Sequence, residues 1–386
     1  MESVMNKKDL MEESGAIRNS YAGLPCQGVW TWLTGKELDG RKPLWSSTPT
    51  ECVIWACLWF FGGCALSISL CVADMSLMWL IPSVILTAGG ARYIVATIIH
   101  HAVHHTVFAS ARKNKVLAEI LSTVTWVQPY DVYRKFHVFE HHGSEFSTAD
   151  DQDLAAIYRM GLTPGKSERE LKRTLLLQCF NPFMHLKFLM GRLKSNFIGA
   201  PFYRVIMSVT WMMVLAALAL TVGAQTFLLS VALPLVLVYQ ICSILHLVTE
   251  HVWVIRPAQQ SVKEAHQNNS LGRFCGEHTP DDRNQAIRSL QWCFWLARHL
   301  FWHLPVRILF VQGSLVVHDW HHRHGGKRDW PNSIQAREIE VSKEAANEVY
   351  SYTDIWGFFN AIEYTLAGIS QSDQHVDLNE LKYRLN

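Results

Sequence analysis

The hydrophobic residues gather in long uncharged runs, and the first two runs predict a pair of membrane-crossing helices. Residues 52–73 contain no charged side chain. A second run extends from Leu77 to about Ile99 and is interrupted only by Gly89-Gly90 and Arg92. Since roughly 20 apolar residues span the hydrocarbon layer, each run is long enough for one crossing.

A third run is long enough for two crossings. Residues 205–249 cover 45 positions without Asp, Glu, Lys or Arg. The weak point at residues 223–226 divides them into helices at about 203–222 and 226–248. Pro234 is expected to kink the second of these helices.

The charges between these runs predict the orientation of four crossings arranged as two tight hairpins. Neither hairpin tip carries Lys or Arg, and the segment between the pairs is basic. Its basic residues include Arg112, Lys113, Lys115, Arg169, Lys172, Arg173, Lys187, Arg192 and Lys194. The positive-inside tendency places this segment and both termini in the cytoplasm. We therefore expect a multi-pass protein of a bacterial inner membrane or the endoplasmic reticulum.

The remaining segments complete an all-α integral membrane prediction. Residues 289–317 are apolar but contain Arg298 and Arg307, which favours an interfacial helix over a third hairpin. We expect a cytosolic N-terminal segment at 1–50, a transmembrane and catalytic domain at 51–330 and a cytosolic tail at 331–386. In this scheme a cytosolic histidine-rich domain caps the four helices.

Composition supports a membrane protein and excludes several classes. Of 386 residues, 49% are hydrophobic and 18% charged, whereas soluble domains usually carry about 25% charged residues. The net charge of +2 gives no reason to expect a nucleic-acid partner. The nine cysteines form no C-x-x-C pair, which favours reduced packing residues over a disulfide framework. The N-terminus has no apolar core and is not expected to be a cleaved signal peptide.

Eleven of the 19 histidines lie in three short stretches. Positions three or four apart share a helix face, so His101 with His105, His137 with His141 and His318 with His322 are each expected to converge. Adjacent histidines such as His141-His142 diverge by about 100° and can serve different metals. The doubled pairs therefore predict a frame for two metal ions.

The ligand type selects the metal. Many neutral imidazoles with few thiolates suit iron, zinc, copper or nickel. Eight histidines would fill two four-coordinate zinc ions and leave no open position, whereas iron accepts them and still binds oxygen. Nearby carboxylates are expected to orient the rings: Glu140, Glu145, Asp150, Asp151, Asp153 and Asp319. Outside the stretches, we expect His185, His299 and His303 to be interfacial anchors and His375 to be solvated.

The three stretches resemble the histidine boxes of the membrane fatty-acid desaturase and hydroxylase family. The resemblance assigns His101 and His105 to the first box, with His100 as a competing ligand, and His137, His141 and His142 to the second. It assigns His318, His321 and His322 to the third box. Thr249-Glu250-His251 resembles a Glu-His pair near the fourth crossing in alkane hydroxylases, which implies His251 as a ninth ligand and His246 as the reserve choice.

The resemblance implies a non-heme diiron enzyme that uses O₂ as co-substrate against a fatty acyl or lipid chain. Desaturation is the leading expectation, and hydroxylation or olefin-forming decarboxylation by the same centre is the alternative. No cytochrome b5-like or dinucleotide motif is found in the sequence. A separate electron donor (ferredoxin, rubredoxin or cytochrome b5) with its reductase is therefore expected. A membrane metal transporter or metal sensor is the competing class, although its histidines usually lie in low-complexity loops.

Overall fold

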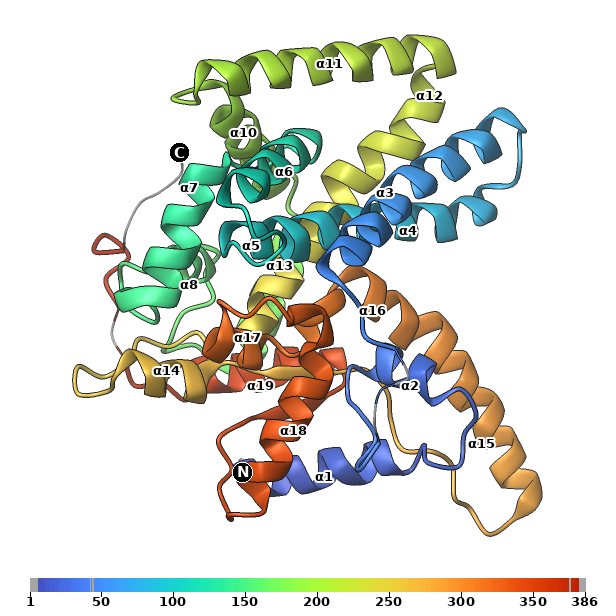
Figure 1. The fold of residues 1–386 in the computed structure, drawn as a ribbon, viewed down its shortest axis with the longest axis vertical. Coiled ribbons are helices and arrows are strands. Elements are labelled where there is room, and N and C mark those ends of the chain that lie inside the picture. The colour runs from blue at the N-terminus through green and yellow to red at the C-terminus, as the bar shows by residue number, and fades with distance from the viewer. Residues whose placement is uncertain (1–5, 42, 44, 375, 382–386) are drawn as a thin grey trace.

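The structure is a computed structural model that describes residues 6–41, 43, 45–374 and 376–381, and its chain is mostly helical (Figure 1). The α-helices are α1 (Lys7–Asn19), α2 (Gln27–Thr34), α3 (Pro49–Val72), α4 (Leu80–Tyr93), α5 (His100–Val103), α6 (Ala111–Val124), α7 (Tyr130–Arg134), α8 (Gln152–Arg159), α9 (Glu168–Phe180), α10 (Pro182–Phe197), α11 (Phe202–Val222), α12 (Ala224–Phe227), α13 (Tyr239–Glu250), α14 (Val262–Asn269), α15 (Gln285–Arg298), α16 (Leu304–Leu309), α17 (His318–His324), α18 (Ser333–Ala345) and α19 (Phe358–Ser370). Short 3₁₀ turns are η1 (Leu77–Trp79), η6 (Gly313–Val316) and η7 (Trp330–Asn332). Four segments are π-helical: η2 (Ile94–Ile99), η3 (Lys135–Ser144), η4 (Leu228–Val238) and η5 (His299–His303).

Four helical segments are long and apolar enough to cross a membrane, as the sequence predicts. They are Pro49–Val72, Leu77–Val103, Phe202–Val222 and Ala224–Glu250. The first begins three residues earlier than the uncharged run because Thr48 and Glu51 form a capping box that satisfies the free N–H groups of the helix start. The second extends beyond Ile99 to include the first histidines.

Glycines allow the first two crossings to pack closely. A Cβ on Gly90 would lie 2.3 Å from the backbone nitrogen of Phe60, and one on Gly63 would lie 2.7 Å from that of Thr87. Small residues at such contacts let transmembrane helices approach with their backbones nearly touching. The pair α3 and α4 is therefore held together by backbone proximity.

The second pair of crossings is divided where the sequence predicts. Gly223, with φ of 86°, separates α11 from α12. Pro234 lies inside the π-helical segment η4, where it removes a backbone donor. Helix α11 packs against α6 and α10 and crosses the top of the molecule in Figure 1. The arrangement as two membrane hairpins stays a prediction.

The C-terminal residues pack into the body that carries the histidines. Strand β2 (Asp354–Trp356) pairs in parallel with β1 (Gly272–Phe274), and α1 packs against β2. Helix α19 covers α9 and α13. The polar residues after position 330 thus form part of the wall around the site, and the proposed domain boundaries stay a prediction.

The apolar segment before the third histidine stretch forms α15, η5 and α16 in succession. Arg307 is buried and donates to the backbone carbonyls of Trp32 and Gly313. Arg298 is exposed and pairs with Glu277. Its location at the membrane interface stays a prediction.

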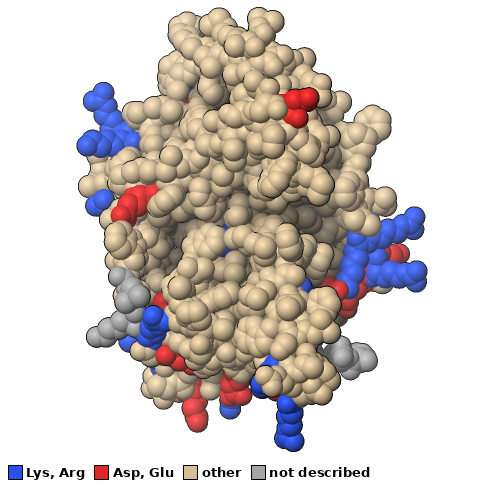
Figure 2. Space-filling model, turned by 90° about the vertical axis from the view of Figure 1, so that its right-hand side faces the viewer, with Lys and Arg blue, Asp and Glu red and all other residues tan. Residues whose placement is uncertain are grey.

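Charge is unevenly distributed over the surface. On the face shown in Figure 2, charged side chains lie mainly in the lower part and at the edges, while the upper surface is largely uncharged. Exposed apolar side chains of α3 and α11 include Trp55, Leu66, Met213 and Leu220. This distribution indicates association with a membrane.

Candidate metal centre

Three histidine stretches, far apart in the chain, meet between the membrane helices and the lower body. The first follows η2 at the start of α5, the second lies within η3, and the third forms α17. Their backbones approach one another in the middle of Figure 1, where α5 and α17 lie near α13. The π-helical geometry of η2 and η3 is frequent at functional sites.

Five histidines form the first group. Their ligand-capable nitrogens all lie within 4.8 Å of one another, and the residues are His100, His104, His137, His142 and His321. The Nε2 atoms of His100 and His321 are only 2.6 Å apart. All three stretches contribute to this group.

Four histidines form the second group, which adjoins the first. They are His141, His251, His318 and His322, again with nitrogens within 4.8 Å of one another. The Nε2 atoms of His318 and His322 are 3.0 Å apart. The ring of His322 stacks on His142 of the first group, with centroids 4.1 Å apart, so the two groups share a boundary.

The nitrogens in these groups lack the partners that buried polar atoms normally have. Six ring nitrogens are buried without a hydrogen-bond partner: Nε2 of His104, His137, His142 and His251, and Nδ1 of His318 and His322. Converging lone pairs without donors fit metal ions, since neutral imidazole is a common ligand for iron and zinc. The residues present therefore fit two metal ions.

Burial keeps most of these rings neutral. Desolvation, with repulsion between neighbouring imidazoles, holds the pKa of His137, His142, His321 and His322 well below the usual value. The same causes lower the pKa of His104 to about 3, with Arg134 adding to the effect. Neutral rings offer a lone pair to a metal without first losing a proton.

His141 is the exception because it faces carboxylates. Burial lowers its pKa, but Asp151 and then Asp153 more than offset this and raise it to about 9. The Nδ1 atom of His141 lies 3.3 Å from Asp151. Such a carboxylate fixes the ring orientation and leaves Nε2 free for a ligand role, as expected for Asp151 from the sequence. Of the other carboxylates, Asp319 bonds Arg337 and does not orient a histidine.

Glu250 adds a second carboxylate at this group. Its Oε1 lies 2.6 Å from Nε2 of His246 and 3.7 Å from Nε2 of His318. The Nδ1 of His246 also bonds the Phe310 carbonyl. With both ring nitrogens engaged, His246 lies outside the second group, whereas His251 lies inside it.

The structure places two of the expected first-box ligands outside both groups. His101 stacks on Trp330, and its Nε2 hydrogen-bonds Ser314. His105 has a left-handed backbone conformation with φ of 62°, and its Nε2 bonds the hydroxyl of Tyr130. The structure brings together His100 and His104 instead, which have the same four-residue spacing.

Sequence reasoning also gave no role to His266. This residue on α14 is buried, and its ring stacks on Phe146 at 3.9 Å and on His322 at 4.5 Å. Desolvation lowers its pKa to about 3. It lies outside the three stretches, and no repeat or spacing in the sequence singles it out.

A third cluster joins Glu277, His299 and His303. The hydroxyl of Tyr21 bonds Nε2 of His299, and the N–H of Gly276 donates to Nδ1 of His303. These hydrogen bonds favour a structural role.

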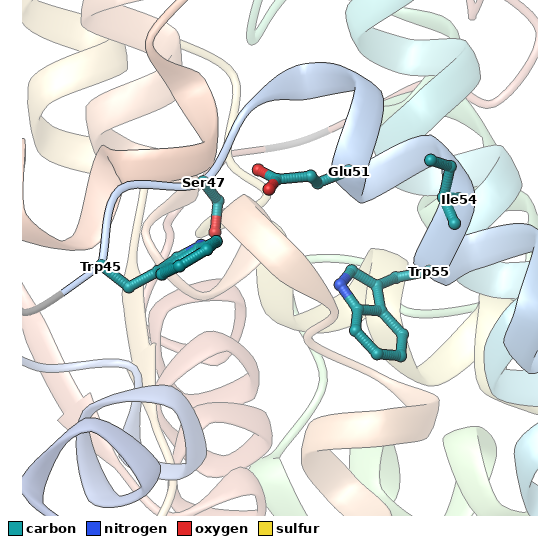
Figure 3. A pocket seen from close by; sticks show the side chains of 5 residues that line it. All are labelled: Trp45, Ser47, Glu51, Ile54 and Trp55. Carbon is teal, nitrogen blue, oxygen red and sulfur yellow. The ribbon is translucent and has the colours of Figure 1, made fainter.

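Other histidines and cavities lie apart from the two groups. His185 bonds Gln240 and the Cys179 carbonyl, and His375 lies outside the described residues. A surface pocket of about 350 Å³ at the start of α3 contains no histidine. Its lining, drawn in Figure 3, comprises Trp45, Ser47, Glu51, Ile54 and Trp55.

Comparison with known proteins identifies one similarity. The family model described as fatty acid desaturase matches residues 75–305. The matched segment contains the first two histidine stretches and His251, while the third stretch follows it. A comparison with curated proteins gives no match.

Proposed function

The chain belongs to the fatty acid desaturase family, and from this premise we propose that it is a membrane oxidoreductase that oxidises an unactivated C–H bond of a fatty acyl chain with two irons and O₂. The observation that carries the proposal is the pair of adjoining histidine groups. Nine buried imidazoles with unpartnered nitrogens have no evident purpose in a packing core, where such groups cost stability.

We propose as iron ligands all nine members of the two groups: His100, His104, His137, His142 and His321 for one ion, and His141, His251, His318 and His322 for the other. When bound, the irons supply the oxidising power that removes hydrogen from the chain. His101, His105 and His246 are not included, because each is engaged by protein groups.

The protein's own residues orient and shield this centre. Asp151 holds the ring of His141 through Nδ1, and Arg337 holds α17 by bonding Asp319 and Asp354. The histidines are mostly below 9% exposed, which excludes bulk water from the reacting groups. Positioning of one C–H bond then selects the product.

Desaturation is the reaction we propose first, in accord with the family description. Hydroxylation and olefin-forming decarboxylation require the same ligands and differ in which carbon is presented. We further propose that the site faces the cytoplasm, where a separate ferredoxin, rubredoxin or cytochrome b5 delivers electrons from its reductase.

The test is a turnover experiment with full-length protein purified from membranes and loaded with iron. It is incubated with O₂, a reductase and donor system, and defined fatty acyl substrates, and products are identified by mass spectrometry. Loss of two hydrogens indicates desaturation, gain of oxygen indicates hydroxylation, and loss of the carboxylate indicates decarboxylation. Stoichiometric zinc with transport across vesicles, and no oxidised product, would overturn the proposal in favour of a transporter.

Variants link the product to the centre. His141→Ala and His321→Ala are expected to abolish turnover while the protein still inserts into membranes. The control is His278→Ala, because His278 is exposed and lies outside both groups. Normal turnover in either of the first two variants would contradict the ligand assignment.

A further inference from the structure

Arg92 differs from the other buried arginines in its lack of partners. Its Nη1 donates to the hydroxyl of Ser243 at 3.0 Å, but Nε and Nη2 have no hydrogen-bond partner. Every other fully buried arginine of the described residues donates from at least two of its nitrogens, as found for Arg18, Arg192, Arg204, Arg273, Arg307 and Arg337. Arg92 is therefore the unsatisfied cation of the interior.

The location of Arg92 makes this lack costly. The residue lies within the candidate membrane span Leu77–Val103, and only 4% of it is exposed. No carboxylate of the described residues forms an ion pair with it, whereas Arg204 of α11 pairs with Glu119 at 2.8 Å. Arginine stays protonated in proteins, so burial without an anion is strongly unfavourable. An ionisable side chain inside a span indicates a functional site by default.

A second guanidinium increases the positive charge. The ring of Tyr239 lies 5.6 Å from the guanidinium carbon of Arg92 and 4.6 Å from that of Arg192. Arg192 is satisfied by backbone carbonyls, including those of Thr125 and Leu235. Carbonyls neutralise no charge, and this part of the bundle therefore attracts an anion.

The two free nitrogens of Arg92 also specify the shape of that anion. Nε and Nη2 lie on the same edge of the planar guanidinium group, and their N–H bonds point in parallel. This edge matches two oxygens of a carboxylate or phosphate in a bidentate pair. A single-atom anion would use the edge less completely.

Arg92 is connected to the histidine groups by two routes. It precedes His100 by eight residues in one continuous span, which corresponds to about 12 Å or less along a helix. Its partner Ser243 starts a polar row on α13 that continues with His246 and Glu250, at spacings that share one face. Glu250 reaches His318 of the second group at 3.7 Å.

We propose that the free edge of Arg92 binds the oxyanion of an acyl-chain molecule, either the carboxylate of a free fatty acid or the phosphate of a phospholipid, and so fixes the chain beside the histidine groups. The role of the bound chain as substrate rests on the proposed function, whereas the binding itself does not. The site recognises a charged end group and excludes the corresponding neutral ester.

The test compares acids with their neutral analogues in binding to the purified, iron-loaded full chain, without O₂ or electron donor. The two pairs are palmitate with methyl palmitate and phosphatidate with diacylglycerol of the same chains. A charge-assisted bidentate pair predicts roughly 10- to 100-fold tighter binding of the anion in one pair. The pair that shows the preference identifies the source of the oxyanion.

Variants assign the preference to Arg92. Arg92→Gln is expected to lose it, and Arg92→Lys to keep part of it, because lysine supplies charge without a paired N–H edge. Arg112→Gln, at an exposed arginine of α6, is the matched control and keeps it. Thermal stability without ligand should not fall in Arg92→Gln, since no ion pair is lost.

Two results would overturn the inference: equal binding of anion and neutral analogue in both pairs, or an unchanged preference in Arg92→Gln. Either result leaves the proposed oxidation untouched. Conversely, a chain that prefers the acid but forms no oxidised product defeats only the proposed function.

Discussion

The choice between neighbouring histidines of the first stretch gives the sharpest prediction. In His104→Asn the first group loses one of five imidazoles, and with it a buried Nε2 that has no protein partner. Loss of an outer-shell partner alone costs about 10- to 100-fold in metal affinity, so loss of a ligand should cost at least that. One iron per chain is then expected to be removed by a chelator that leaves the wild-type protein intact.

The matched variant is His105→Asn. His105 bonds Tyr130 and belongs to neither group, and its φ of 62° is a conformation that asparagine tolerates. The expected loss is one hydrogen bond, about 0.5–1.5 kcal/mol of unfolding free energy, with both irons retained.

Chelator titration followed by metal analysis measures both variants on the same scale. Mössbauer spectra report the two iron environments independently of turnover. Full iron retention in His104→Asn, or iron loss in His105→Asn with the fold intact, would refute the assignment of His104.

Three further predictions follow from the surroundings of the centre. Because His141 has a pKa of about 9, Co²⁺ binding must expel a proton at neutral pH. Affinity should rise up to about tenfold per pH unit between 7 and 9, and Asp151→Asn, measured by titration, should abolish this slope. Arg337→Gln leaves two buried carboxylates unpaired and should cost about 3–5 kcal/mol, seen as a lower unfolding midpoint; an unchanged midpoint would refute the structural role. Gly90→Ala should disrupt the contact of α3 with α4, whereas Gly62→Ala meets no atom within 4 Å and should be tolerated.

The membrane helices were predictable because hydrophobicity alone determines them. The four uncharged runs coincide with the four candidate spans, and the break at Gly223 occurs where a positive φ is needed. The extension of the second span to Val103 was not predictable, since His100 and His101 are polar yet continue the helix.

The identity of the first-stretch ligands was beyond sequence reasoning for a physical reason. His100 with His104 and His101 with His105 have the same four-residue spacing, so periodicity cannot distinguish them. The rotation of the helix about its axis decides, and that rotation is set by packing. His266 is similar, because its proximity to His322 depends on how α14 folds back.

The pairing of β1 with β2 was also beyond the sequence. These strands are three residues long and are separated by 79 residues. Short strands carry too few positions to show an alternating pattern. Their pairing positions Asp354, which joins Arg337 and Lys36 in a buried network behind α17.

The π-helical segment Ile94–Ile99 gives the first stretch a length dependence. Such a segment holds one residue more than an α-helix would over the same turns. Deleting a single residue there would convert it to regular helix and turn the following histidines by about 100°. That deletion would bring His101 and His105 toward the positions of His100 and His104, so an insertion or deletion at this point exchanges one coordinating pair for its neighbour without changing any histidine.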